Sequence, residues 1–145
     1  MIRKDKRLRL ATALLIANLI LIWGNSLLPG EISGAISGFV RDLIAWLLPG
    51  DSPPGEGHGL LRKLAHFTEF ASLGMILTWI MLLLDKTPPL ALAGGFAAAC
   101  IDETIQMFVP DRGPAFTDVL IDSSGVLTGL ILFLLIRYCR HHHPH

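Results

Sequence analysis

Residues 64–84 read LAHFTEFASLGMILTWIMLLL, an apolar stretch that carries His66 and Glu69 near its start. The stretch is long enough to cross a bilayer, because a membrane span takes about 20 helical residues. A charged side chain at the bilayer centre costs roughly 2.5 to 3.5 kcal/mol, so it needs a partner, a neutral protonation state or contact with water. The sequence therefore predicts a membrane helix with a polar site built into it.

Three other stretches, residues 10–28, 90–109 and 115–136, have similar length and apolar character. The connections between the last three of the four stretches are short, which predicts antiparallel neighbours. With 145 residues, of which 52% are hydrophobic and 17% charged, the chain has the size of one domain and the composition of a membrane protein. We predict a single all-α domain over residues 1–145, an integral membrane four-helix bundle.

Lys and Arg are unevenly distributed along the chain. If the N-terminus is cytoplasmic, eight of the 12 lie in inner segments and four lie outside, at Arg41, Arg62, Lys63 and Arg112. Cytoplasmic segments of membrane proteins carry the excess of these residues, so both termini are expected inside. The first apolar stretch, which follows a basic N-terminus, could also be a signal peptide. Its apolar run, however, is longer than the roughly 7 to 15 apolar residues of a signal peptide, and no small-residue cleavage site follows it. The net charge of zero excludes a large phosphate-binding surface, and we predict no nucleic-acid partner.

The long outer connection contains a further helical pattern. Apolar side chains recur at helical spacing over residues 32–48, with serines and charged residues between them. This predicts an additional helix in the first extracytoplasmic loop, either amphipathic at the interface or re-entrant. It could equally pack across the top of the bundle. The Pro- and Gly-rich residues 51–59 predict a connector.

Under this topology, polar side chains of three spans meet in the outer half of the bundle. The most deeply placed are predicted to be catalytic and are also the candidates for metal ligands: His66, Glu69, Asp102, Glu103 and Asp122. Those nearer the rim are predicted to bind substrate: Lys63, Gln106, Arg112 and Asp118.

Some of these residues have structural alternatives. Lys63 and Arg112 could be interfacial anchors whose long side chains reach water, and Asp118 could cap the last span. Neither explanation covers His66 or Asp122, which lie at least one turn inside an apolar run. We therefore expect one enclosed polar pocket.

The chemistry open to such a pocket is broad. A histidine with several carboxylates can hold a divalent metal, which attracts phosphate groups and activates water. Adjacent carboxylates can instead act as acid and base. Lys63 and Arg112 would suit a phosphate or carboxylate at the rim. No spacing is diagnostic of one metal or one reaction, so a divalent metal is an option and no cofactor is assigned.

Other features predict packing without chemistry. Gly125 and Gly129, and the pair Gly94 and Gly95, are small residues of the kind that lets membrane helices approach closely. The two isolated cysteines and the His-rich residues 141–145 match no recognised ligand spacing, and we assign them no function.

The polar positions fall into three motifs. They are K-x-x-H-x-x-E-F at 63–70 with Gly74 after it, D-E-x-x-Q-x-F-V-P-x-R at 102–112, and D-V-x-x-D-x-x-G at 118–125. In this order they resemble the VanZ-like family of integral membrane proteins, named for an accessory factor of teicoplanin resistance. The resemblance spans residues 10–136. It implies a bacterial cytoplasmic membrane protein with an envelope role and, for some members, reduced teicoplanin susceptibility, but it implies no reaction.

Two positions qualify the resemblance. Asp122 stands where we expect Asn in the family, which adds a carboxylate. Asn25 and Ser26 resemble the family's Ser-rich segment near the end of the first span.

From residues and resemblance together we predict a cell-envelope protein with an outward-facing polar pocket. The pocket would bind, and could process, a lipid or lipid-linked envelope molecule, in connection with lipoglycopeptide (teicoplanin) resistance. An enzyme of this kind would be a hydrolase or transferase. The alternatives are a non-catalytic binding module for a glycopeptide or cell-wall precursor, and a structural or partner-binding subunit. The expected partners are membrane lipids and a lipid-linked cell-wall precursor or lipoglycopeptide, and no oligomeric state is assigned.

Overall fold

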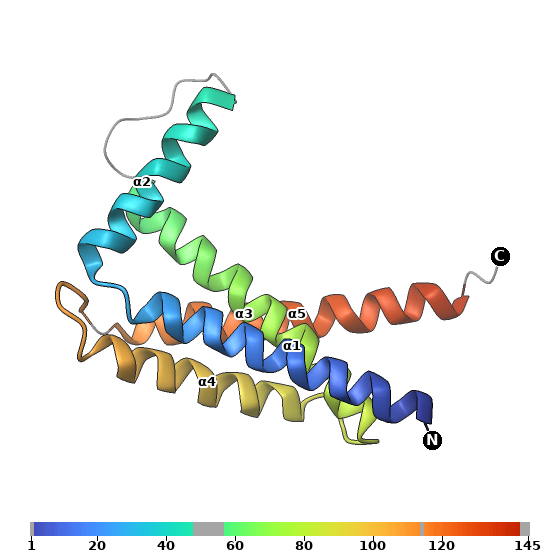
Figure 1. Cartoon of the computed structure of the whole chain (residues 1–145). Helices are drawn as coiled ribbons and strands as arrows, with labels where there is room; N and C mark the ends of the chain where they lie inside the picture. Colours follow the sequence, from blue (N-terminus) through green and yellow to red (C-terminus); the bar gives the residue numbers. More distant parts are fainter. Residues whose placement is uncertain (1, 48–56, 114, 143–145) are drawn as a thin grey trace.

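The structure, a computed structural model, describes residues 2–47, 57–113 and 115–142 (Figure 1). Its helices are α1 (Ile2–Ser26), α2 (Gly30–Leu47), α3 (Gly57–Leu83), α4 (Leu90–Gln106) and α5 (Phe116–His142). The described ranges contain no strand, so the predicted all-α class is confirmed. Of the predicted connector at 51–59, residues 51–56 lie outside the described residues, and residues 57–59 form the start of α3.

Three helices are long and apolar enough to cross a membrane by length and composition: Arg3–Ser26, Leu61–Leu83 and Phe116–His142. Helix α4 has 17 residues, and at 1.5 Å per residue it covers roughly 26 Å of a hydrocarbon core about 30 Å thick. The chain is therefore a helical membrane protein. The fourth span at 90–109 stays a prediction, and so does the four-helix bundle that depends on it.

Helices α1, α3, α4 and α5 pack together, and α3 contacts each of the other three (Figure 1). Helix α2 begins at Gly30, shortly after the end of α1, angles away from α1, α4 and α5, and contacts α3 (Figure 1). The helix predicted at 32–48 is thus present with slightly different ends. Its position at an interface or within a bilayer remains a prediction.

Glycines allow α3 and α5 to pack with their backbones in contact. A Cβ atom added at Gly74 would meet the carbonyl oxygen of Val126, and one added at Gly129 would meet the carbonyl oxygen of Ala71. Gly125 likewise faces the backbone of α3. Small residues at these positions permit such an approach between membrane helices. The close packing predicted for Gly125 and Gly129 is confirmed, and it places the beginnings of α3 and α5 beside each other.

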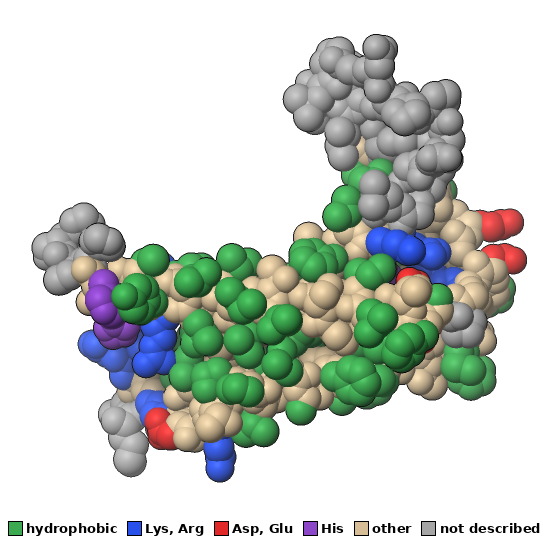
Figure 2. All heavy atoms as spheres, turned by 180° about the vertical axis from the view of Figure 1, so that it is seen from behind, with side chains coloured by type: hydrophobic (Ala, Val, Ile, Leu, Met, Phe, Trp, Pro, Cys, Tyr) green, Lys and Arg blue, Asp and Glu red, His purple; other side chains and the backbone are tan. Residues whose placement is uncertain are grey.

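Apart from the buried polar residues described below, the core of the bundle is apolar, and so is much of its outer surface. The buried core consists of Ile22, Phe70, Leu73, Ala98, Ala99, Val119 and Val126. Large apolar side chains are also exposed along the outside, among them Ile20 at 67% and Phe96 at 52% (Figure 2). An exterior with so many exposed apolar side chains is suited to lipid tails and not to water.

Candidate functional site

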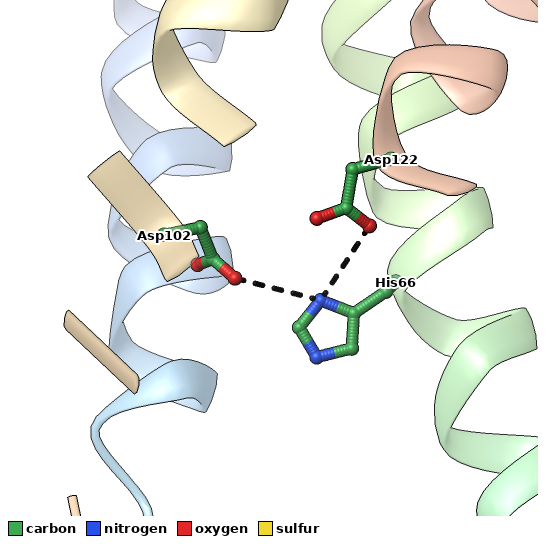
Figure 3. Close-up of side chains that lie close together, drawn as sticks. All are labelled: His66, Asp102 and Asp122. Atoms are coloured by element: carbon green, nitrogen blue, oxygen red, sulfur yellow. Dashed lines mark ion pairs between the residues drawn. The ribbon is translucent and has the colours of Figure 1, made fainter. Parts of the chain in front are cut away.

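Three ionisable side chains from three helices converge in the bundle: His66 of α3, Asp102 of α4 and Asp122 of α5 (Figure 3). The Nδ1 atom of His66 lies 3.8 Å from Oδ2 of Asp102 and 3.9 Å from Oδ1 of Asp122. The three residues are only 9%, 0% and 2% exposed, respectively. We call them the His–Asp–Asp cluster. The structure thus brings together three of the five deeply placed residues predicted from the sequence.

The spacing within the cluster leaves room for a small ligand. Both separations exceed a hydrogen-bond length, which for these atoms is about 2.7 to 3.2 Å. One potential ligand atom from each residue lies within 4.8 Å of the others. The atoms Oδ1 of Asp102 and Oδ1 of Asp122 are buried without a hydrogen-bond partner among the described residues. One imidazole nitrogen and two carboxylates suit a divalent cation such as zinc or manganese, so these residues fit a metal.

Asp102 is held in place by an amide one helical turn away. Nε2 of Gln106 donates to Oδ2 of Asp102 at 2.7 Å and to Oγ of Ser26 at 3.3 Å. Residues four apart share one face of a helix, which explains why Gln106 reaches Asp102. Gln106 therefore has a positioning contact in addition to the substrate-binding role that the sequence predicts for it.

Glu69 lies one turn further along α3 from His66, next to α1. Nδ2 of Asn25 donates to Oε1 of Glu69 at 2.9 Å. The second oxygen, Oε2, is buried without a partner in the described part of the chain. Glu69 therefore borders the cluster and is fixed by α1.

Glu103 serves the start of α5. Its Oε1 atom accepts the backbone N–H of Ala115, the residue before the first of the helix. The N-terminus of a helix has unpaired N–H groups and a partial positive charge, so a carboxylate there is stabilising. Asp118, considered above as the cap, is the third residue of α5 and only half-buried. The catalytic role predicted for Glu103 stays a prediction, beside the capping contact that the structure gives it.

Arg112 holds the end of α1. Its Nε donates to the carbonyl oxygen of Leu28 at 3.1 Å, and its Nη2 donates to that of Asn25 at 3.0 Å. The last carbonyls of a helix lack hydrogen-bond partners within the helix, and the Arg112 side chain supplies donors to them. Burial, with a contribution from Arg62, lowers the pKa of the Arg112 guanidinium from its ordinary value. Its Nη1 is buried without a partner among the described residues and could still receive an anion.

Two small cavities flank His66. One, of about 10 Å³, is lined by Lys63, His66, Gln106, Asp118 and Asp122 together with Arg62 and Ile121. The other, of about 60 Å³, is lined by Asn25, Ser33, Ile36, Arg62, Ala65, His66 and Arg112. A cavity of roughly 10 to 15 Å³ holds one water molecule. The predicted rim residues thus border the cluster, but the space beside it admits small molecules or ions only.

Sequence reasoning missed three residues of this site. Arg62 lines both cavities, and its signal was its place one turn before His66 on the same face of α3. Asn25 and Ser26 contact the side chains of Glu69 and Gln106. Their signal is a pair of adjacent polar residues at the end of an apolar stretch. The pair is compared above with the Ser-rich segment of the VanZ-like family, but no role is predicted for it.

Comparison with known proteins places the chain by its sequence. The profile of the family described as VanZ/LLP1 matches residues 9–137, a range that contains every side chain of the site. No curated protein and no solved structure matches the chain. Because the matched range covers most of the 145 residues, the chain belongs to the VanZ/LLP1 family.

Proposed function

We propose that this membrane protein acts in the cell envelope, and that its His–Asp–Asp cluster binds and processes the polar head of a lipid or lipid-linked envelope molecule. The observation that carries the proposal is the convergence of His66, Asp102 and Asp122 from three helices, with buried carboxylate oxygens that have no partner among the described residues. Ionisable groups inside membrane helices are expensive, and they usually mark a functional site.

The surroundings of the cluster support a phosphate-bearing ligand. Arg62, Lys63 and Arg112 line the cavities beside His66. Guanidinium groups bind phosphate and carboxylate through paired hydrogen bonds, and a lysine adds a mobile charge. The exposed apolar surface of the neighbouring helices would accommodate the acyl chains of the same molecule.

The cluster residues would hold a divalent cation through Nδ1 of His66 and one oxygen each of Asp102 and Asp122. Such an ion supplies a Lewis acid for a phosphoryl oxygen and lowers the pKa of bound water. The chain's own contribution is to orient these ligands: Gln106 fixes Asp102, and the packing of α3 on α5 sets His66 opposite Asp122. A hydrolase or transferase acting on a lipid or lipid-linked substrate would use this arrangement.

Membership of the VanZ/LLP1 family supports the connection with teicoplanin-type resistance. We place the cluster on the outer side of a bacterial cytoplasmic membrane, with both termini inside, because most Lys and Arg residues then lie in cytoplasmic segments.

A second candidate is a non-catalytic module that binds a glycopeptide or cell-wall precursor. The observation that favours it is the size of the cavities at His66, about 10 and 60 Å³, which would admit only part of a headgroup. Arg62, Lys63 and Arg112 would then bind the ligand at the rim of these cavities. A structural or partner-binding subunit, the third prediction from the sequence, has no observation of its own.

The experiment that separates these functions is a product search. The purified protein is incubated with phospholipids and lipid-linked cell-wall precursors, with and without zinc or manganese, and the mixture is analysed by mass spectrometry. An enzyme yields a new product that Asp102→Asn abolishes. A matched control is Glu31→Gln, which neutralises an exposed carboxylate of α2 and should leave product formation unchanged. Saturable binding of one of these molecules without product in any mixture would replace the enzyme with the binding module.

A further inference from the structure

The far end of the bundle contains a second, larger hollow. Near the chain termini, the start of α1 and the end of α5 diverge (Figure 1), and residues of α1, α3 and α5 line a space there. This space has a volume of about 420 Å³, and its lining includes Arg7, Trp79, Leu83, Phe133, Arg137 and Arg140. An adjoining space of about 430 Å³ shares Arg7 and Leu83 with it. We call the first space the basic hollow, and none of its residues belongs to the site at His66.

The arginines of the basic hollow form no ion pair with a carboxylate among the described residues. Arg7 comes from α1, while Arg137 and Arg140 are three residues apart on α5. The carboxylate of Asp85 lines the adjoining space, but it pairs with Lys4 at 2.7 Å. Figure 2 shows several Lys and Arg side chains at this end, beside the histidines. A ligand that neutralises them must therefore be an anion.

The floor of the hollow adds a requirement for apolar contact. Trp79, Leu83 and Phe133 line it and are half-buried. Tryptophan and arginine are both typical of the level at which a membrane helix leaves the hydrocarbon. Free phosphate would use the arginines and leave this apolar surface without a partner. A phospholipid offers an anionic head and an acyl region in one molecule.

We propose that the basic hollow binds an anionic membrane phospholipid, with Arg7, Arg137 and Arg140 on its phosphate and with Trp79 and Phe133 against its acyl region. Basic pockets between membrane helices are known sites for anionic head groups. Helices α1 and α5 share few direct contacts, so the bound lipid joins the start of one to the end of the other. The proposal is independent of any chemistry at the His–Asp–Asp cluster.

Native mass spectrometry of the purified protein in detergent tests the proposal. The protein is titrated with phosphatidylglycerol, with phosphatidylcholine of the same chain length, and with inorganic phosphate. The wild type should bind a first phosphatidylglycerol at least about tenfold more tightly than phosphatidylcholine. Millimolar inorganic phosphate should not displace it. Equal affinity for the two lipids, or displacement by phosphate, would overturn the proposal.

Charge-matched variants decide whether the site is specific. The triple variant Arg7→Gln/Arg137→Gln/Arg140→Gln should lose the preference for phosphatidylglycerol. The control Lys6→Gln/Arg9→Gln/Lys86→Gln removes the same charge at the same end, but these residues do not line either space, so it should keep the preference. An equal loss of the preference in both triple variants would mean that the overall positive charge of this end attracts phosphatidylglycerol without a specific site. That result would contradict the proposal.

Two further variants guard against misfolding and against a charge effect from the opposite end. If the triple variant loses its helical circular dichroism, Arg140→Gln alone should still lower the preference at least about threefold, and no change would contradict the proposal. Glu31→Gln, which changes the charge at the opposite end but belongs to neither site, should keep the full preference.

Discussion

The two ends of the bundle carry their charges in opposite ways. At one end the His–Asp–Asp cluster is buried, and its carboxylates face an imidazole. At the other end the arginines of the basic hollow are exposed around an open space. A buried ionisable group loses its hydration and must find partners within the protein, whereas an exposed guanidinium stays hydrated until a ligand replaces the water. The depth of a charge in the bundle, more than its residue type, therefore decides its role.

The largest expected effect concerns the packing that holds the two ends in register. Gly129→Val should lower the free energy of unfolding by about 3 kcal/mol or more, because its Cβ would meet the carbonyl oxygen of Ala71. A detergent-denaturation titration followed by circular dichroism measures this change. The control is Gly24→Val, since a Cβ at Gly24 has no neighbour within 4 Å. Equal stability of the two variants would contradict the packing of α3 on α5.

A pair of arginines tests the comparison directly. Arg112→Gln should lower the free energy of unfolding by about 2 kcal/mol, because the part-buried carbonyls of Leu28 and Asn25 lose their donor. Arg140→Gln, in the basic hollow, should change it by less than about 0.5 kcal/mol. The same titration measures both variants. A larger loss for Arg140→Gln would reverse the roles assigned to the two ends.

Coupling within the cluster is a smaller effect. Groups in contact give coupling free energies of about 0.5 to 3 kcal/mol, so a double-mutant cycle of His66→Gln and Asp122→Asn should yield at least about 1 kcal/mol in unfolding free energy. The control cycle pairs Asp122→Asn with Glu31→Gln, an exposed residue of α2, and should be additive within about 0.5 kcal/mol. Additivity in both cycles would indicate separate roles for the cluster residues.

Labelling distinguishes the ends without a change in stability. In a chain freed of Cys100 and Cys139, a cysteine at exposed Gly113 should react with an impermeant reagent in intact cells. A cysteine at Lys86, near the basic hollow, should not react. Reaction at Lys86 in intact cells would place the cluster on the cytoplasmic side.

Much of the helical pattern could be predicted from the sequence, because apolar runs between Pro, Gly and charged residues report where a chain can span a membrane. The ends of helices were less predictable. Helix α1 begins at Ile2 and α5 continues to His142, since Lys and Arg favour helix and extend it beyond the apolar run. The hydropathy of the sequence shows where an apolar run ends, whereas backbone hydrogen bonding determines where the helix ends.

The residues of the candidate site were likewise only partly predictable from the sequence. His66 and Asp122 could be predicted, because a charge deep in an apolar run is costly and topology places both at one depth. The contacts of Glu103 and Arg112 could not be predicted, because they depend on how the turn between α4 and α5 folds back on α1. That turn includes Asp111 in the left-handed region, with φ of 59°. No periodic pattern encodes such a geometry.

The His–Asp–Asp cluster is the proposed functional centre, and a comparison of two neighbouring carboxylates tests this role. Asp102 belongs to the cluster, whereas Glu103 caps α5. Asp102→Asn and Glu103→Gln are compared by mass-spectrometric detection of product or, where the wild type forms none, by saturable binding of the lipid-linked precursor. We predict that Asp102→Asn removes this function at least about a hundredfold, or 2.7 kcal/mol, while Glu103→Gln retains it and loses about 1 kcal/mol of stability. Full function in Asp102→Asn together with loss of function in Glu103→Gln would contradict the assignment of the functional centre to the cluster.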